Sequence, residues 1–140
     1  MPTLFTRIIN GEIPGRFVWK DDRCVAFLTI EPMRPGHTLV VPREEVAHWI
    51  DLDTDLCAHV FEVARVIGQA QSAAFAPRRI GVMIVGEEVP HAHVHVVPIN
   101  EVSDLSFAAI DRNPTRESLD AAAAAIREQL QALGRSEVAG

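Results

Sequence analysis

Three histidines alternate with apolar residues in the stretch PHAHVHVVP, which spans residues 90–98. Side chains on a β-strand point alternately to its two faces, and each residue advances by ~3.3 Å. The pattern therefore predicts a strand that carries His91, His93 and His95 on one face. The opposite face would carry the small or β-branched side chains that suit a core, namely Ala92, Val94 and Val96. One face is thus predicted to be structural, and the other presents three imidazoles.

The chemistry of this face depends on what imidazole can do near neutral pH. An imidazole can act as nucleophile, acid or base, and it can also ligate zinc or another transition metal. Three alternating histidines on a strand span too far for all of them to reach one ion easily. Two of them at positions i and i+2 could do so, with His37 of PGHTLVVP as a further ligand. Nucleophilic catalysis and metal-dependent catalysis are both open at this point.

Helices are predicted in three parts of the chain. Apolar residues at helical spacing predict a short helix in TLFTRIIN, near the N-terminus. A long amphipathic helix is predicted in DTDLCAHVFEVARVIGQAQSAAFAP, with Asp53 or Thr54 as its cap and Pro77 at its end. An alanine-rich helix is predicted from about Pro114 to Leu133.

Strands are predicted between these helices. RFVWKDDRCVAFLTI is typical of two strands on either side of a turn at Asp21 and Asp22, and HTLVVP is typical of a short buried strand. RRIGVMIVG and the histidine strand are separated only by a short link, so we expect them to pair antiparallel. The order of elements favours an α+β fold with an antiparallel sheet.

Length and charge limit the class of protein. The 140 residues fit one domain with a hydrophobic core, and the net charge of −6 argues against broad binding of a nucleic-acid backbone. A small anionic ligand remains compatible with that charge. Cys24 and Cys57 form no CxxC pair and are expected to be buried free thiols, which favours a reducing cytoplasm. We expect no secretory signal and no membrane association, because no apolar run approaches the ~20 residues of a membrane span.

Two segments of the chain resemble the histidine triad (HIT) family. HAHVHVV matches the His-x-His-x-His signature of the family, and RIINGEIPGRFVWKDDRCVAFLTIEPMRPGHTLVVP is similar to the N-terminal half of its nucleoside phosphoramidate hydrolases. The resemblance implies a single HIT domain over residues 1–140, with a core at about 3–100 and a C-terminal helical extension at about 104–134. It also implies about five antiparallel strands with one long central helix, a homodimer, a nucleotide substrate and no cofactor.

The resemblance assigns a role to each of four histidines. The middle triad histidine of the family attacks the α-phosphate of a nucleotide and forms a nucleotidyl-histidine, which water then hydrolyses; His93 matches it. A backbone carbonyl near the first triad histidine, here His91, orients the attacking ring. The third histidine, His95, and an upstream histidine, matched by His37, lie near the phosphate oxygens. Relatives that transfer the nucleotidyl group to a sugar phosphate carry Gln in the third position, so His95 favours hydrolysis.

The resemblance also implies a nucleoside pocket. Its candidate apolar residues are Leu4, Phe5, Ile8, Phe27 and Ile30. Thr29 stands where relatives usually have an Asp that binds both ribose hydroxyls, so ribose binding should weaken or ligand choice should shift. Glu87 and Glu88 stand in a shortened loop where many relatives have polar phosphate contacts. A carboxylate beside a phosphate is repelled unless it points away, is protonated or pairs with a cation, although one of the two could instead act as an acid toward the leaving group. Glu88 is the one counted among the nucleotide-binding candidates.

Two further expectations follow from where the chain departs from its relatives. Some bacterial relatives bind a structural zinc at positions that correspond here to Thr3, Thr6 and Glu45, and because these residues are not the usual ligands we predict no structural zinc. The changes at Thr29 and in the shortened loop also support an alternative function, a nucleotide-binding module that has weak or no turnover.

Overall fold

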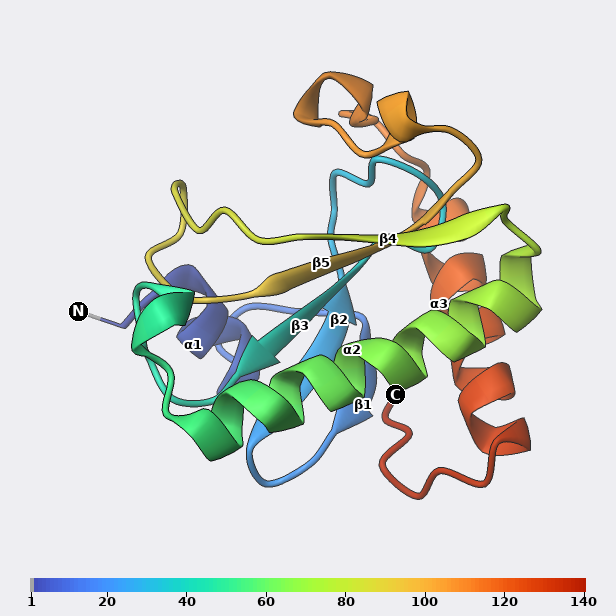
Figure 1. Ribbon diagram of the computed structural model, residues 1–140. Helices are drawn as coiled ribbons and strands as arrows, with labels where there is room; N and C mark the ends of the chain where they lie inside the picture. Colours follow the sequence, from blue (N-terminus) through green and yellow to red (C-terminus); the bar gives the residue numbers. More distant parts are fainter. Residues whose placement is uncertain (1) are drawn as a thin grey trace.

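Five antiparallel strands form one sheet in the computed structural model of the protein, which describes residues 2–140 (Figure 1). The strand order is β1-β2-β3-β5-β4, so β5 lies next to β3 and β4 is at the edge of the sheet. The strands are β1 (Phe17–Lys20), β2 (Cys24–Leu28), β3 (Thr38–Pro42), β4 (Arg79–Met83) and β5 (Val94–Ile99). The α+β class and the five-stranded antiparallel sheet are therefore as predicted.

The three helices also follow the predicted pattern. They are α1 (Leu4–Ile9), α2 (Thr54–Phe75) and α3 (Arg116–Ala132), and short 3-10 turns occur at Trp49–Asp51, Val102–Asp104 and Phe107–Ala109. Of the two candidate caps for α2, Asp53 is the one used: its side chain accepts a hydrogen bond from the amide of Leu56. None of the helices in residues 2–140 is long and apolar enough to cross a membrane.

The two faces of the sheet are covered by different helices. α1 packs on one face, in a cluster that includes Phe5, Ile8 and Phe27. The long helix α2 packs on the other face, where alternating strand residues such as Val40 and Val96 are buried against it. Because both faces are covered, β2 and β3 are buried at every position.

The C-terminal helix α3 belongs to the larger of these clusters. It packs against α2 and β1 and buries five of its apolar side chains: Leu119, Ala122, Ala123, Ile126 and Leu130. The chain then returns along β1, where Trp19 forms a bridge with Val138. The C-terminal extension therefore completes the core of its own chain and covers one edge of the sheet.

Two details differ from the sequence predictions. β5 begins only at Val94, so His91 and His93 lie in the segment before the strand and not on it, and His91 is in a bend. The pairing stops there because the amide of Ala92 bonds to Val46 O, at 2.7 Å, and not to a neighbouring strand. Among the cysteines, Cys24 is buried as expected, whereas Cys57 is only half-buried.

Candidate active site

His93 is held by a backbone carbonyl two residues before it. Its Nδ1 lies 2.7 Å from the carbonyl oxygen of His91. A carbonyl can only accept a hydrogen bond, so Nδ1 carries the proton and Nε2 of the neutral ring carries the lone pair. The backbone that precedes β5 therefore decides which nitrogen of His93 is free to react.

His93 as a whole is only 7% exposed, but its Nε2 is not among the fully buried unpaired polar atoms of the described chain, which are Gln71 Oε1 and Arg135 Nε. This nitrogen forms no hydrogen bond within residues 2–140. A neutral, accessible lone pair on an oriented ring is what a nucleophile requires.

His91 is fixed on both sides of its ring. Its Nε2 lies 2.7 Å from Pro42 O and therefore donates, which leaves Nδ1 to accept from the hydroxyl of Thr3 at 2.7 Å. The ring thus connects the end of β3 with the start of α1. This residue, fully buried, supports the backbone carbonyl that orients His93.

A second hydrogen-bonded chain fixes His95. The backbone amide of Met33 donates to Nδ1 of His37 at 3.0 Å, so the proton of the His37 ring is on Nε2. Nε2 of His37 then donates to Nδ1 of His95 at 2.9 Å. His95 consequently carries its own proton on Nε2, and this N–H is a free donor in the part of the chain that the structure describes. The rings of His93 and His95 lie side by side, with centroids 4.9 Å apart.

Burial keeps these four histidines neutral at physiological pH. It lowers the pKa of His37 to about 3 and that of His95 to about 4, and each also faces a neighbouring imidazole whose positive charge would repel its own. Burial lowers the pKa of His91 and of His93 as well, although a hydrogen bond to a carbonyl opposes the shift in both. Neutral rings are required for the assignment of donors and acceptors made above.

An aromatic wall lies beside the triad. Phe5 contacts the ring of His93 edge-on at 4.7 Å and that of His91 at 5.9 Å, and it packs against Phe27 at 5.7 Å. Ile8 belongs to the same buried cluster. The structure therefore brings three of the five apolar pocket candidates together with the histidines.

The other candidates are exposed, except Thr29, which is half-buried. Leu4 is 47% exposed and Ile30 is 70% exposed, and neither belongs to a core cluster. Thr29 is next to His37 through a backbone hydrogen bond of 3.4 Å, but its hydroxyl accepts from the amide of Glu31 in a local turn. Glu88 is exposed, as is Glu87.

Three residues around the histidines were not singled out in the sequence. Thr3, which the sequence suggests only as a position without a zinc ligand, bonds to His91. Gln71, buried on α2, donates to Gly36 O at 2.9 Å and to Val96 O at 2.8 Å, and so ties the turn before His37 to β5. Phe107 places its ring edge-on to His95, with centroids 5.9 Å apart. Gln71 could have been found in the sequence only as a polar residue that interrupts the apolar face of α2.

Thr3, Thr6 and Glu45, which are predicted to hold no zinc, form a hydrogen-bonded cluster. The carboxylate of Glu45 accepts from the amide of Thr3 and the hydroxyl of Thr6, both at 2.6 Å. Thr3 in turn caps α1 by accepting from the amide of Thr6. These side chains satisfy one another, and the absence of a structural zinc remains a prediction.

The fold agrees with the comparisons to known proteins. A family model described as the HIT domain matches residues 10–102. An uncharacterized HIT-like protein of Methanocaldococcus jannaschii is 35% identical over 99 residues, which are 68% of this chain and 77% of the relative. Among solved structures, a hypothetical histidine triad nucleotide-binding protein from Sulfolobus tokodaii is 27% identical and covers 94% of this chain and 93% of its own, with a TM-score of 0.82. A HIT family hydrolase from Legionella pneumophila is 30% identical over 69% of this chain and 91% of its own, with a TM-score of 0.61.

A sheet of this order with a buried histidine triad defines a class of small α+β proteins. The chain belongs to the HIT domain family.

Proposed function

We propose that the protein is a nucleotidyl hydrolase that cleaves nucleoside 5′-phosphate derivatives at the α-phosphate, in the manner of the nucleoside phosphoramidate hydrolase branch of the family. The observation that carries the proposal is the free Nε2 of His93, whose other ring nitrogen donates to His91 O at 2.7 Å. The Sulfolobus tokodaii and Legionella pneumophila relatives, described as nucleotide-binding and as a hydrolase, support the same class of ligand and reaction.

The chemistry has two steps. Nε2 of His93 attacks phosphorus, a bond from Nε2 to phosphorus forms, and the bond to the leaving group breaks; the leaving group takes up a proton from solvent. The ring is then positively charged, and the hydrogen bond from Nδ1 to His91 O stabilises that charge. Water attacks phosphorus in the second step, which releases the nucleoside monophosphate and restores neutral His93.

His95 and His37 act on the phosphate oxygens in this proposal. The Nε2–H of His95 donates to an oxygen on which negative charge increases in the transition state, and His37 keeps that proton on Nε2 through its own bond to Nδ1. Phe5 and Phe27 pack on the nucleoside, with Ile8, Leu4 and Ile30 as further apolar contacts. Thr29 takes the ribose position and Glu88 lies toward the leaving group.

The test uses an adenosine 5′-phosphoramidate and measures AMP release. We expect His93→Ala to lower kcat by about a thousandfold or more, since removal of a covalent nucleophile has effects of that order. His48→Ala is the matched control, because His48 is exposed and lies outside the site. Mass spectrometry of quenched reactions should find an adenylyl group on the peptide that contains His93. Equal turnover by wild type and His93→Ala would reject the proposal.

A nucleotide-binding module without turnover is the second candidate. It is favoured by Thr29, whose hydroxyl is engaged with the amide of Glu31 and carries no charge for the ribose. AMP affinity measured by calorimetry, together with no product after long incubation, would support this function over hydrolysis.

We also propose that the protein is a homodimer that pairs through β4. The two edges of the sheet differ: β1 bonds to the C-terminal tail, with Lys20 N to Glu137 O at 2.9 Å and Ala139 N to Val18 O at 3.1 Å. β4 bonds only to β5 within residues 2–140, so its outer edge is open. Beside it lies a groove toward α2 that is lined by Phe61, Ala64, Gly68, Ile80 and Val82, among others.

Sedimentation can test this assembly. Val82 is 47% exposed, and Val82→Lys should convert a wild-type dimer to a monomer, whereas Val102→Lys, at an 87% exposed position outside the groove, should leave it dimeric. A monomeric wild type would contradict the proposal.

Cytoplasmic location, which the two free cysteines favour, stays a prediction.

A further inference from the structure

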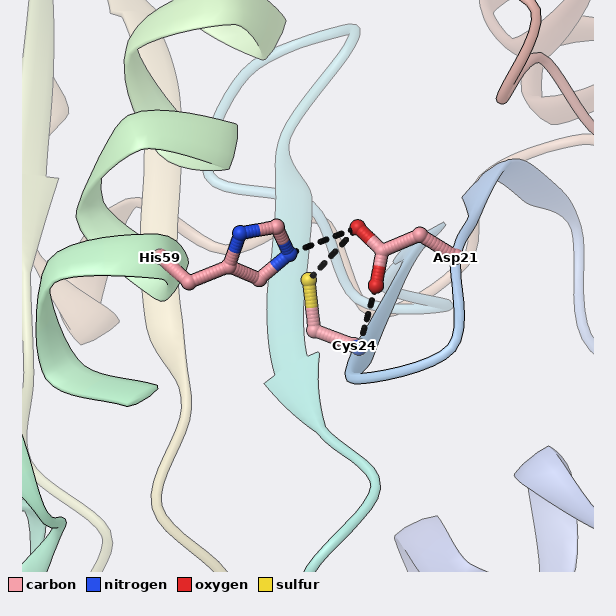
Figure 2. Close-up of side chains that lie close together, drawn as sticks. All are labelled: Asp21, Cys24 and His59. Atoms are coloured by element: carbon pink, nitrogen blue, oxygen red, sulfur yellow. Dashed lines mark hydrogen bonds and ion pairs between the residues drawn. The ribbon is translucent and has the colours of Figure 1, made fainter. Parts of the chain in front are cut away.

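Three residues with different ligand chemistry meet on the side of the sheet that α2 covers, away from the triad. Asp21 lies in the turn between β1 and β2, Cys24 begins β2, and His59 lies on α2 (Figure 2). One ligand atom from each lies within 4.8 Å of the other two. In the described chain this is the one group of at least three such residues that meets the spacing for a shared metal ion.

We propose that Asp21, Cys24 and His59 form a binding site for a zinc-class divalent cation. On a tetrahedral ion with ordinary zinc bond lengths, neighbouring S, N and O ligand atoms lie about 3.4 to 3.6 Å apart. Sγ of Cys24 is 3.6 Å from Oδ2 of Asp21, which already fits. Nε2 of His59 is 2.8 Å from the same oxygen and within 4.8 Å of Sγ, so its distance to Oδ2 must lengthen by about half an ångström when both atoms ligate an ion in the tetrahedral geometry of zinc.

The carboxylate is held in position for this role. Oδ1 of Asp21 accepts from the backbone amides of Arg23 at 2.8 Å and Cys24 at 2.7 Å, while Oδ2 accepts from the indole of Trp19 at 2.8 Å. Burial alone would raise the pKa of Asp21, but these hydrogen bonds and that from His59 outweigh it and lower the pKa to about 2. Oδ2 is therefore an ionised oxygen that is held facing the other two ligands. Hydrogen bonds from surrounding groups orient ligating side chains in the same way in metal sites.

The partial exposure of the cluster gives an ion access from solvent, and the ion would displace protons from its ligands. Cys24 is fully buried, but the side chain of His59 is 30% exposed and that of Asp21 is 13% exposed, so an ion can enter past the helix. Binding replaces the thiol proton of Cys24, which leaves to solvent. It also replaces the proton between Nε2 of His59 and the carboxylate, which goes to solvent or to Nδ1. Solvent fills the fourth position, and thiolate with imidazole favours zinc over magnesium or calcium.

The experiment titrates Co²⁺ and Zn²⁺ into chelator-treated protein. We expect about one equivalent of Co²⁺ to produce a thiolate-to-cobalt charge-transfer band, and Zn²⁺ to abolish it by competition. His59→Asn, at a partly exposed position that should still fold, should weaken binding at least tenfold, and Cys24→Ser should remove the band. Cys57→Ser and His93→Ala are the matched controls, and both should bind like the wild type.

The control variants distinguish binding at Asp21, Cys24 and His59 from binding at the histidine triad. A band lost in Cys57→Ser, or binding lost in His93→Ala, would place the ion elsewhere and overturn the proposal. Folded wild type without any band at millimolar Co²⁺ would show that Asp21, Cys24 and His59 are only a hydrogen-bonded structural cluster. Because phosphoramidate hydrolysis is not the readout, failure of the proposed function would leave this result unaffected.

Discussion

Acidification from pH 7 to pH 5 should destabilise the protein through His37 and His95. These side chains are 2% and 8% exposed, and burial lowers their pKa values to about 3 and about 4 from an ordinary value of 6.5. Because the folded pKa lies below the unfolded one, the unfolded state binds more protons as the pH falls below 6.5. The stability is therefore complete above pH 6.5 and is lost progressively toward pH 4 and pH 3.

The magnitude follows from the distance between the pH and the unfolded pKa. At pH 5 the pH is about 1.5 units below the pKa of a histidine in the unfolded chain. Protonation therefore stabilises the unfolded state by about 2 kcal/mol for each of the two residues. The two residues together lower the free energy of unfolding by about 4 kcal/mol, a large part of the stability of a small domain. His37→Gln removes one of these groups, so its loss of stability between pH 7 and pH 5 should be about 2 kcal/mol smaller than that of the wild type.

Urea denaturation at pH 7, 6 and 5 measures these differences in wild type and variant. NMR titration of the imidazole resonances gives an independent reading, since neither His37 nor His95 should titrate above pH 5 in the folded protein. A free energy of unfolding that is constant between pH 7 and pH 5, or ring resonances that titrate near 6.5, would refute the assignment of neutral, buried histidines.

Three substitutions test other contacts around the site, each by urea denaturation at pH 7. Thr3→Val removes the donor to Nδ1 of His91 and a helix cap, and should cost about 1 to 3 kcal/mol; a change below about 0.5 kcal/mol would count against that hydrogen bond. Gln71→Leu removes a buried donor to the carbonyls of Gly36 and Val96 and should also cost about 1 to 3 kcal/mol. A more stable variant would contradict the inference that Gln71 stabilises the contact between this turn and β5. Gly36→Ala places a Cβ at φ +92° and against the ring of Phe75, so we expect a loss of about 2 kcal/mol or more, and wild-type stability would show that the turn relaxes easily.

The sheet and helices could be predicted because their signals are local. Short, largely apolar runs bounded by turn residues predict β2 and β3, and the 3.6-residue period with Asp53 and Pro77 predicts α2 within one or two residues. The start of β5 could not be predicted in this way. The alternation of His91, His93 and His95 begins in a segment whose backbone amides bond outside the sheet, and a period of two in the sequence does not distinguish that segment from a strand.

The candidate site could be predicted only in part, because its contacts join distant segments. The triad is visible as a pattern, but the bond from His37 to His95 spans 58 residues and that from Thr3 to His91 spans 88. The same reason hides the cluster of Asp21, Cys24 and His59, whose members look individually like a turn residue, a buried thiol and a helix-surface histidine. Pairing of the strands and packing of α2 bring them together, and no local spacing in the sequence records that.

The backbone gives the two open nitrogens of the site opposite roles. The carbonyl of His91 leaves a lone pair on Nε2 of His93, while the amide of Met33, acting through His37, leaves a proton on Nε2 of His95. An acceptor and a donor thus stand side by side, as attack on phosphorus with stabilisation of its oxygens requires. The arrangement depends on neutral rings, because a second proton on His37 would need a new acceptor where the amide of Met33 now donates. The burial that keeps the rings neutral for chemistry near pH 7 is therefore the same burial that makes the fold sensitive to acid.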